Sequence, residues 1–389
     1  MSINFDEIID RRGTSCLKYD FAVERGYPKD VLPFWVADMD FRAPVPVIDA
    51  LAARTAHGIF GYTQIKDDYF NVLRDWFRTH HAWTVQRGEL VITPGVVFAV
   101  ATAIRAYTAP GEAVIIQQPV YYPFASMIRQ NGRTLIDSSL QFADGRYSID
   151  FADFEQKIID HKVKLFILCS PHNPVGRVWT RTELEQLAAI CLRRHVIIVA
   201  DEIHEEFVRP GFRHIPFASL SADAAAITVT CTSPSKTFNL AGLQISNIFI
   251  SNESLRRRFK EELSRTGYDE PNTLGLAGAK AAYEHGAPWL KELLAYIEEN
   301  YAFTKEYLAA HLPKVKLIEP EGTYLIWMDF SAYGLSDKEL NEKVIHEANL
   351  WLDDGPIFGA DGSGFQRMNL ACPRSTLQIG LECLAKAFA

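Results

Sequence analysis

The chain has 389 residues, of which 48% are hydrophobic and 23% charged, and its formal net charge is -8. This length is more than one simple core requires and predicts two domains. The acidic balance argues against nonspecific binding to nucleic acid, which needs a basic face. No basic start precedes an apolar run, and no stretch has the length of a membrane span, so we expect neither a signal peptide nor a membrane anchor.

The cysteines are scattered and form no C-x-x-C pair, which argues against structural zinc and against a disulfide framework. They are Cys16, Cys169, Cys191, Cys231, Cys372 and Cys383. Free thiols are typical of a reducing compartment. We therefore expect a cytoplasmic protein with no bound metal.

Short apolar runs in the middle of the chain alternate with amphipathic segments. The runs are apolar on both faces and lie at residues 113–117, 164–169, 196–200 and 226–231. The helix-like segments lie at residues 96–107, 124–131, 151–159 and 182–193. Such runs are typical of parallel strands that helices cover on both sides. The alternation predicts a doubly wound α/β domain with a mainly parallel sheet, which we place at residues 46–288.

The pattern of the chain changes after residue 288. A long helix is predicted at residues 290–311, and strands follow at residues 315–318, 323–330 and 365–371. Further helices are predicted at residues 337–348 and 375–388. These elements predict a smaller α+β domain with antiparallel strands, against which the first part of the chain packs. Its expected extent is residues 1–45 and 289–389.

Four polar features occur at the ends of strands, and ligands of open α/β sheets bind beyond the carboxyl ends of the strands. Gly95 directly precedes a helix, whose free N–H groups suit a phosphate. Asn173 lies in a turn after one strand, and Asp201 closes the next. Lys236 follows a further strand in the sequence Ser-Pro-Ser-Lys. Each feature alone has an ordinary explanation: a turn glycine, an Asx-turn, a helix cap or ion pair, and a surface lysine.

Taken together, these features suit pyridoxal 5′-phosphate (PLP). A lysine amine forms Schiff bases with aldehydes, and the hydroxyls of Ser233 and Ser235 can donate to phosphate oxygens. A buried carboxylate such as Asp201 needs a partner, and a protonated pyridine nitrogen supplies one. The order of the features along the chain predicts a PLP site that Lys236 anchors.

That order, with three further segments, resembles the fold-type I PLP enzymes of the class I/II aminotransferase superfamily. The segments are FWVADMDF at residues 34–41, ADEIH at residues 200–204 and NLACPR at residues 369–374. They are similar to the MalY/PatB branch, which contains cystathionine β-lyases and other cysteine-conjugate C–S lyases. The resemblance extends from residue 10 to the C-terminus.

The resemblance implies roles for individual residues. Lys236 would carry PLP as a Schiff base, Asp201 would pair with the pyridinium nitrogen, and Tyr121 would stack on the ring. Asn173 would lie near the phenolic oxygen and the substrate carboxylate. Arg374 would bind that carboxylate, since a guanidinium presents a bidentate fork.

The resemblance also implies a phosphate site formed by backbone and side chains at Val96, Val97, Ser233 and Ser235. Tyr62 of a neighbouring subunit would complete it, so a homodimer is expected. Two residues depart from the common aminotransferase pattern. His204 stands where many relatives have a tyrosine at the phenolic oxygen of the cofactor, and Gln244 where many have an arginine at the phosphate. Both departures fit the lyase branch.

We therefore expect a C–S β-lyase that cleaves L-cystathionine or a related L-cysteine S-conjugate to a thiol, pyruvate and ammonia. A class I/II aminotransferase is the first alternative, because both reactions begin with removal of the α-proton. A regulatory protein is the second alternative. Because the sequence contains no recognisable DNA-binding motif, such a protein would act through protein contact.

Overall fold

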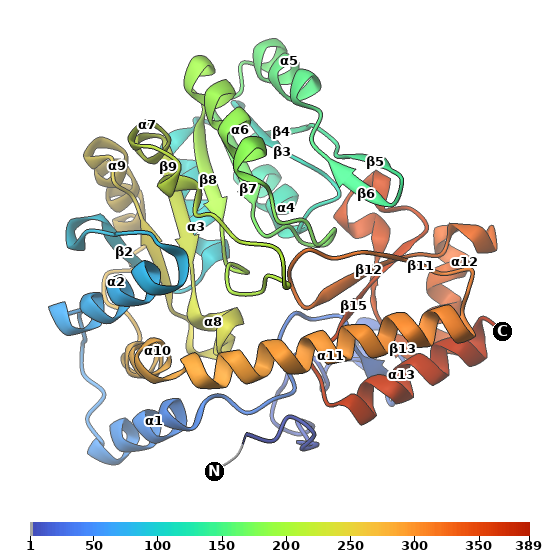
Figure 1. Ribbon diagram of the computed structural model, residues 1–389. Helices are drawn as coiled ribbons and strands as arrows, with labels where there is room; N and C mark the ends of the chain where they lie inside the picture. The colour runs from blue at the N-terminus through green and yellow to red at the C-terminus, as the bar shows by residue number, and fades with distance from the viewer. Residues whose placement is uncertain (1–2) are drawn as a thin grey trace.

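A seven-stranded sheet forms the centre of the larger unit in the computed structural model, which describes residues 3–389 (Figure 1). Its strands lie in the order β2-β10-β9-β8-β7-β3-β4. They span Leu90–Thr93 (β2), Ala113–Ile116 (β3), Thr134–Asp137 (β4), Leu165–Cys169 (β7), Ile197–Asp201 (β8), Thr228–Thr232 (β9) and Ser246–Phe249 (β10). All run in one direction except β10, which is antiparallel to both of its neighbours. The predicted mainly parallel sheet is confirmed.

Helices cover both faces of this sheet, because its strands are apolar on both faces. In β3, Val114 and Ile116 face one layer of helices, whereas Ile115 faces the other. The first layer comprises α3 (Val96–Tyr107), α4 (Pro123–Gln130) and α9 (Glu253–Ser264). The second comprises α5 (Phe151–His161) and α6 (Arg181–Arg194). The helices predicted between the strands are confirmed, with ends that agree within two residues.

Strand β10 was not predicted, because polar residues interrupt its apolar pattern. Ser246 and Asn247 are both buried within it. The hydroxyl of Tyr69 donates a hydrogen bond of 2.8 Å to Oδ1 of Asn247. A buried asparagine side chain is unusual in a strand and more typical of a loop. Here the distant Tyr69 supplies the hydrogen bond that this side chain needs.

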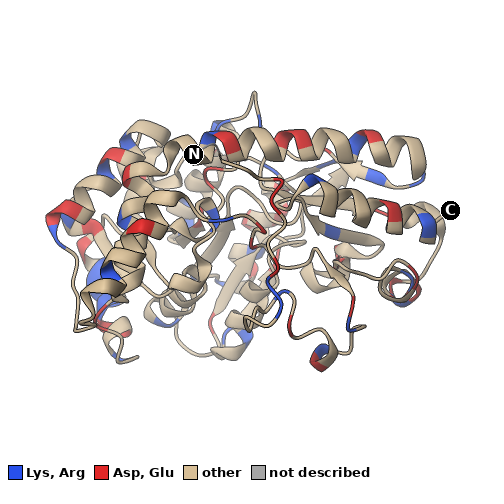
Figure 2. Cartoon of the chain, turned by 90° about the horizontal axis from the view of Figure 1, so that it is seen from below, with Lys and Arg blue, Asp and Glu red and all other residues tan. Residues whose placement is uncertain are grey.

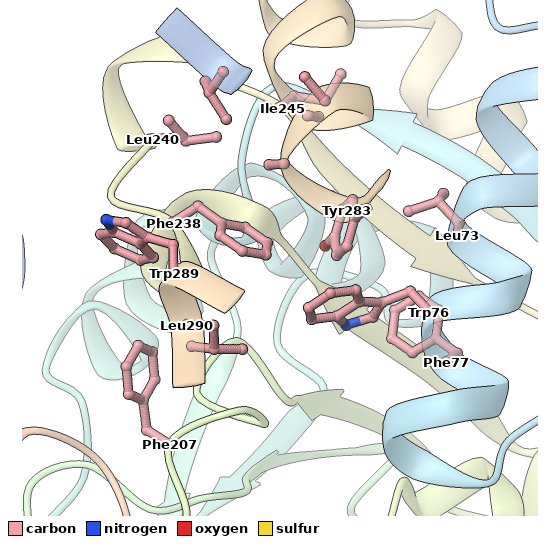
Figure 3. Packing of buried hydrophobic residues seen from close by; sticks show 14 of the residues in the cluster. Leu73, Trp76, Phe77, Phe207, Phe238, Leu240, Ile245, Tyr283, Trp289 and Leu290 are labelled. Atoms are coloured by element: carbon pink, nitrogen blue, oxygen red, sulfur yellow. The ribbon is translucent and has the colours of Figure 1, made fainter. Parts of the chain in front are cut away.

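An aromatic core fixes the segment that follows Lys236 (Figure 3). Phe238 lies edge-on to Trp76, with ring centroids 5.5 Å apart. Tyr283 packs edge-on against both of these rings. The helices that supply this core are α2 (Asp67–His81), α10 (Thr273–His285) and α11 (Ala287–His311). Since each such aromatic pair contributes about 0.5–1.5 kcal/mol beyond simple burial, the core holds the lysine segment in place.

The smaller unit is built around an antiparallel sheet in the order β11-β12-β15-β14. Its elements are β11 (Lys316–Ile318), β12 (Leu325–Asp329), α12 (Asp337–Glu342), β14 (Asp353–Asp354), β15 (Phe365–Asn369) and α13 (Arg374–Ala387). The predicted antiparallel α+β unit is confirmed. The helix predicted at residues 337–348 ends earlier as an α-helix, since it continues as a π-helical turn at Lys343–Glu347.

The N-terminal segment packs against this smaller unit. Its strand β1 (Leu32–Pro33) pairs in parallel with β13 (Leu350–Trp351). Phe34 then enters the core of the unit, where a Cβ added to Gly380 of α13 would lie 2.6 Å from its ring. Only glycine allows so close an approach. The packing of the N-terminal segment is as expected, whereas the domain limits at residues 46 and 288 stay a prediction.

Four further elements are α1 (Val45–His57), β5 (Gln141–Ala143), β6 (Arg146–Ser148) and α7 (Ala222–Ala226). The short helix α8 (Pro234–Thr237) lies inside the larger unit and carries Lys236. Acidic and basic residues are interspersed along the helices seen from below (Figure 2). Within residues 3–389, every helix is too short or too polar to pass through a membrane.

Candidate active site

The carboxyl ends of β7, β8 and β9 lie side by side, because these strands are parallel and in register. Cys169 pairs with Asp201, and Asp201 with Cys231. A pocket opens at this edge of the sheet. Most of the predicted site residues line it: Val96, Val97, Tyr121, Asn173, Asp201, His204, Ser233, Ser235 and Lys236. Two predicted residues, Tyr62 and Arg374, lie outside it.

Lys236 lies on the short helix α8. Ser233 caps this helix, and its Oγ accepts a hydrogen bond of 3.1 Å from the N–H of Ser235. The Nζ of Lys236 donates to the backbone carbonyl of Ala37 at 2.6 Å. The amine is therefore held at a fixed point on the pocket wall.

Burial lowers the pKa of Lys236 to about 8, and the positive charge of Arg367 acts in the same direction. The carboxylates of Asp38 and Asp201 oppose this shift. Roughly a tenth of the amine is therefore unprotonated at pH 7, far more than for an ordinary lysine. An unprotonated lysine can attack an aldehyde and can accept a proton.

The carbonyl that accepts from Lys236 belongs to a backbone segment fixed by two side chains. The hydroxyl of Tyr324 also donates to the Ala37 carbonyl, at 2.9 Å. The Nδ2 of Asn369 donates to the carbonyls of Val36 and Asp38, at 2.8 and 2.7 Å. The smaller unit therefore determines where the lysine amine rests.

Asp201 closes β8 on the wall of the pocket. Burial raises its pKa to about 7, although the N–H of Ile203 donates to it at 3.2 Å and Lys236 lies nearby. Within residues 3–389, no lysine, arginine or histidine forms an ion pair with it. A cation that bound beside this carboxyl group would favour its ionised form. A protonated pyridine nitrogen is a cation of that kind.

His204 lies on the same side of the sheet edge and also lines the pocket. Burial lowers its pKa well below the ordinary range, and the charges of Lys236 and Arg367 add to the effect. Its Nδ1 is buried and has no hydrogen-bond partner in the part of the chain that the structure describes. The neutral imidazole can therefore form a hydrogen bond to a ligand.

The start of α3 forms one end of the pocket. Gly95 is its N-cap and no side chain occupies the first-turn N–H groups, which begin at Val96. These groups, with the hydroxyl of Ser235 on the facing wall, suit a phosphate. The hydroxyl of Ser233, in contrast, donates to the carbonyl of Ile245 at 2.8 Å. This hydrogen bond fixes the backbone at Ser233, and the expected contact of Ser233 with the phosphate stays a prediction.

The guanidinium group in the pocket belongs to Arg367 of β15. Its Nη1 donates to Oδ1 of Asn173 at 2.9 Å, and its Nη2 pairs with the carboxylate of Asp353. Arg374 instead begins α13, where its Nε donates to Oδ1 of Asn300 at 2.7 Å. The structure therefore does not bring Arg374 into the pocket, and its expected role in binding the substrate carboxylate stays a prediction.

Arg367 was not predicted, although the sequence contains a signal for it. An arginine between Phe365 and Met368, within a segment predicted to be a strand, needs a partner if the strand is buried. Other residues on the pocket wall were also not predicted, among them Trp35, Tyr122 and Asp353. Trp35 and Asp353 follow no strand of the large sheet, and Tyr122 lies several residues beyond the end of β3, so the strand-end pattern does not find them.

Tyr62 lines a second cleft, together with Gln244. Its side chain is 95% exposed. Pro94 lines both cavities, so the two are neighbours. The structure therefore does not bring Tyr62 into the pocket of its own chain.

The residues of the pocket fit PLP. An amine of lowered pKa suits its aldehyde, and helix N–H groups with a serine hydroxyl suit its phosphate. PLP also offers a partner to each of the two pocket groups that lack one. Its ring nitrogen suits the carboxyl group of Asp201, and a ring substituent suits a nitrogen of His204. Tyr121 offers an aromatic face beside them.

The chain matches the family Aminotransferase class I and II over residues 29–384, and it belongs to that family. It is 45% identical over 387 residues to the cystathionine beta-lyase PatB of Bacillus subtilis (strain 168), and all of both chains is covered at 100%. Cystalysin of Treponema denticola, whose structure contains PLP, is 38% identical with a TM-score of 0.96, covering 100% of this chain and 99% of that one. The PLP-bound C–S lyase from Staphylococcus hominis is 33% identical with a TM-score of 0.93 at the same coverage. The chain is thus a PLP-dependent enzyme.

The stability of the cofactor-free protein is expected to depend on pH through Asp201. Its pKa is about 7 in the folded protein and near 3.8 when unfolded, so the folded form binds more protons between these values. Stability is therefore lost as pH rises from about 4 to 7. Asp201→Asn removes this loss, and its advantage over the parent protein should grow by roughly 2–3 kcal/mol between about pH 5 and 7.

Urea unfolding of both cofactor-free proteins at several pH values measures this difference. Asp144→Asn, which changes an exposed carboxylate, serves as the control. A constant difference between Asp201→Asn and the parent protein across this pH range would contradict the expected desolvation of Asp201.

Proposed function

We propose that this enzyme cleaves the Cβ–S bond of L-cystathionine or a related L-cysteine S-conjugate and releases a thiol, pyruvate and ammonia. The pocket chemistry that supports this is a buried amine, Lys236, and an unpaired carboxyl group, Asp201, with Arg367 between the two units of the chain. The observation that carries the choice of a lyase is the full-length similarity, at 45% identity, to a cystathionine β-lyase.

The substrate carboxylate has one suitable partner in the pocket. Asn173 and Asp353 already hold the guanidinium fork of Arg367, but its buried Nε has no hydrogen-bond partner within residues 3–389 and can donate to a carboxylate. Asn173, which accepts from Arg367 at 2.9 Å, sets the orientation of that fork. We assign the α-carboxylate of the substrate to these two residues, in place of Arg374.

The proton on Cα has an acceptor in Lys236. PLP, when bound, supplies an aldehyde that captures amines and a ring that draws electrons from Cα. The amine of Lys236 takes the Cα proton, because burial lowers its pKa and so raises its unprotonated fraction near neutral pH. Asp201 holds a proton on the ring nitrogen, and loss of the Cα proton allows the thiolate on Cβ to leave.

The other pocket residues are assigned to the cofactor. Tyr121 covers one face of the ring, and neutral His204 lies at its phenolic oxygen. The first turn of α3, at Val96 and Val97, and Ser235 hold the phosphate. The aromatic and aliphatic side chains that line the pocket exclude water. Because the dielectric constant is then lower, each polar contact within the pocket is stronger.

A homodimer is proposed because Tyr62 lies outside its own pocket. Its ring is 95% exposed beside the exposed side chains of Ile59 and Phe60, and exposed apolar groups of this kind mark interfaces. In a dimer, Tyr62 of the partner subunit would reach the phosphate.

Refolding Tyr62→Ala and Lys236→Ala chains together tests this arrangement, because only a mixed dimer has one intact site. We expect pyruvate release to recover to about a quarter of the parent rate with random pairing; no recovery would place Tyr62 within its own site.

The cytoplasm is the proposed location. All six cysteines are free thiols, which is usual in a reducing compartment.

Pyruvate release from L-cystathionine, without any keto acid, tests the proposed function. The parent protein should release pyruvate continuously, and Lys236→Ala should lower the rate by roughly 10²–10⁴-fold, since it removes the group that accepts the proton. Lactate dehydrogenase with NADH provides the readout. A product that forms only after a keto acid is added would instead identify an aminotransferase.

Two arginines provide a matched test of carboxylate binding. Arg367→Lys keeps the charge but loses the fork, so kcat/KM should fall by about 100-fold, mainly through KM. Arg374→Lys, outside the pocket, should leave kcat/KM within about threefold of the parent value. Steady-state kinetics of both variants measure the contrast. The reverse order of effects would return the role to Arg374.

A further inference from the structure

A second arginine lies beside the aromatic wall of the pocket. The guanidinium carbon of Arg25 is 5.0 Å from the ring centroid of Trp35 and 5.9 Å from that of Trp351. Trp35 lines the pocket, and Trp351 stacks on it with centroids 4.4 Å apart. Tyr27 also stacks on Trp351, at 4.1 Å. Cation–π contact with this stack gives Arg25 a defined position.

The charge of Arg25 is not neutralised by the protein. Within residues 3–389, no carboxylate lies within ion-pair distance of its guanidinium group. The side chain is exposed, whereas Arg367 is buried and paired with Asp353. A guanidinium that is held in place and unpaired is available to an anion from solution.

Arg367 and Trp35 both line the pocket, and Arg25 contacts the ring of Trp35 without lining the pocket itself. One cation therefore lies inside the pocket, and the other is exposed beside its aromatic wall. The two positions suit a substrate with a carboxylate at each end.

We propose that Arg25 binds a carboxylate on the leaving thiol, so that the enzyme favours thioethers whose far end carries a carboxylate. This inference rests on the proposed C–S lyase function. L-cystathionine has one carboxylate next to the reacting Cα, for Arg367, and a second beyond the sulfur, for Arg25. S-ethyl-L-cysteine has the same reacting portion but lacks the second carboxylate, so it does not engage Arg25.

The test compares these two substrates with the holoenzyme and the variant Arg25→Gln. We expect kcat/KM for L-cystathionine to fall about 10- to 100-fold, the effect of losing a hydrogen bond between charged groups. For S-ethyl-L-cysteine the change should stay within about threefold. Arg25→Lys, which keeps the charge, should fall between the parent and Arg25→Gln. Added NaCl should reduce the preference of the parent enzyme for L-cystathionine and leave that of Arg25→Gln unchanged, because salt screens exposed charges.

A matched control is Arg257→Gln on α9, which changes net charge equally at another exposed arginine. It should not alter the ratio of the two kcat/KM values. An equal loss for both substrates in Arg25→Gln would show that Arg25 only supports the aromatic wall and would overturn the inference. Unchanged kcat/KM values for both substrates would also overturn it. If the parent enzyme releases pyruvate from neither substrate, the proposed function itself is wrong, which is a distinct outcome.

Discussion

Burial of an amine and a carboxyl group at the ends of neighbouring strands is the constraint on which the whole site depends. Lys236 follows β9 and Asp201 closes β8, in a sheet whose two faces are both covered by helices. Loss of water disfavours the charged form of each group, so the lysine pKa falls to about 8 and that of the aspartate rises to about 7. Within residues 3–389, neither group is paired with a side chain of opposite charge. PLP offers both partners at once, an aldehyde for the amine and a basic nitrogen for the acid.

The same pocket depends equally on the smaller unit, and mostly on one of its strands. Arg367 and Asn369 are two residues apart in β15, so their side chains lie on one face of the strand. Arg367 enters the pocket, while Asn369 holds the backbone on both sides of Ala37, whose carbonyl accepts from Lys236. The residue proposed to bind the substrate carboxylate and the resting position of the Lys236 amine are therefore both set by this one strand. Any shift of this strand would move both together.

The larger fold could be predicted because its signals are local. Strands that are apolar on both faces and helices with one apolar stripe are recognisable from a few residues each. Strands β2, β4 and β10 were not predicted, and β10 shows the limit of this approach, because its buried Asn247 is acceptable only when Tyr69 of a distant helix supplies a donor. Similarly, the sequence suggested the Ser233 hydroxyl as a ligand donor, whereas the folded chain uses it for the carbonyl of Ile245.

The sequence by itself determined the sheet, the reactive residue types at its strand ends and the family to which they are similar. These properties depend on patterns within short segments and on the order of those segments. Only the tertiary structure decided that Arg367 faces the pocket while Arg374 packs against Asn300, and that Tyr62 lies outside. Two arginines on one stretch of chain have the same chemistry, and they differ only in the distant groups that surround them. Desolvation and pairing are set by such long-range packing, which no local pattern records.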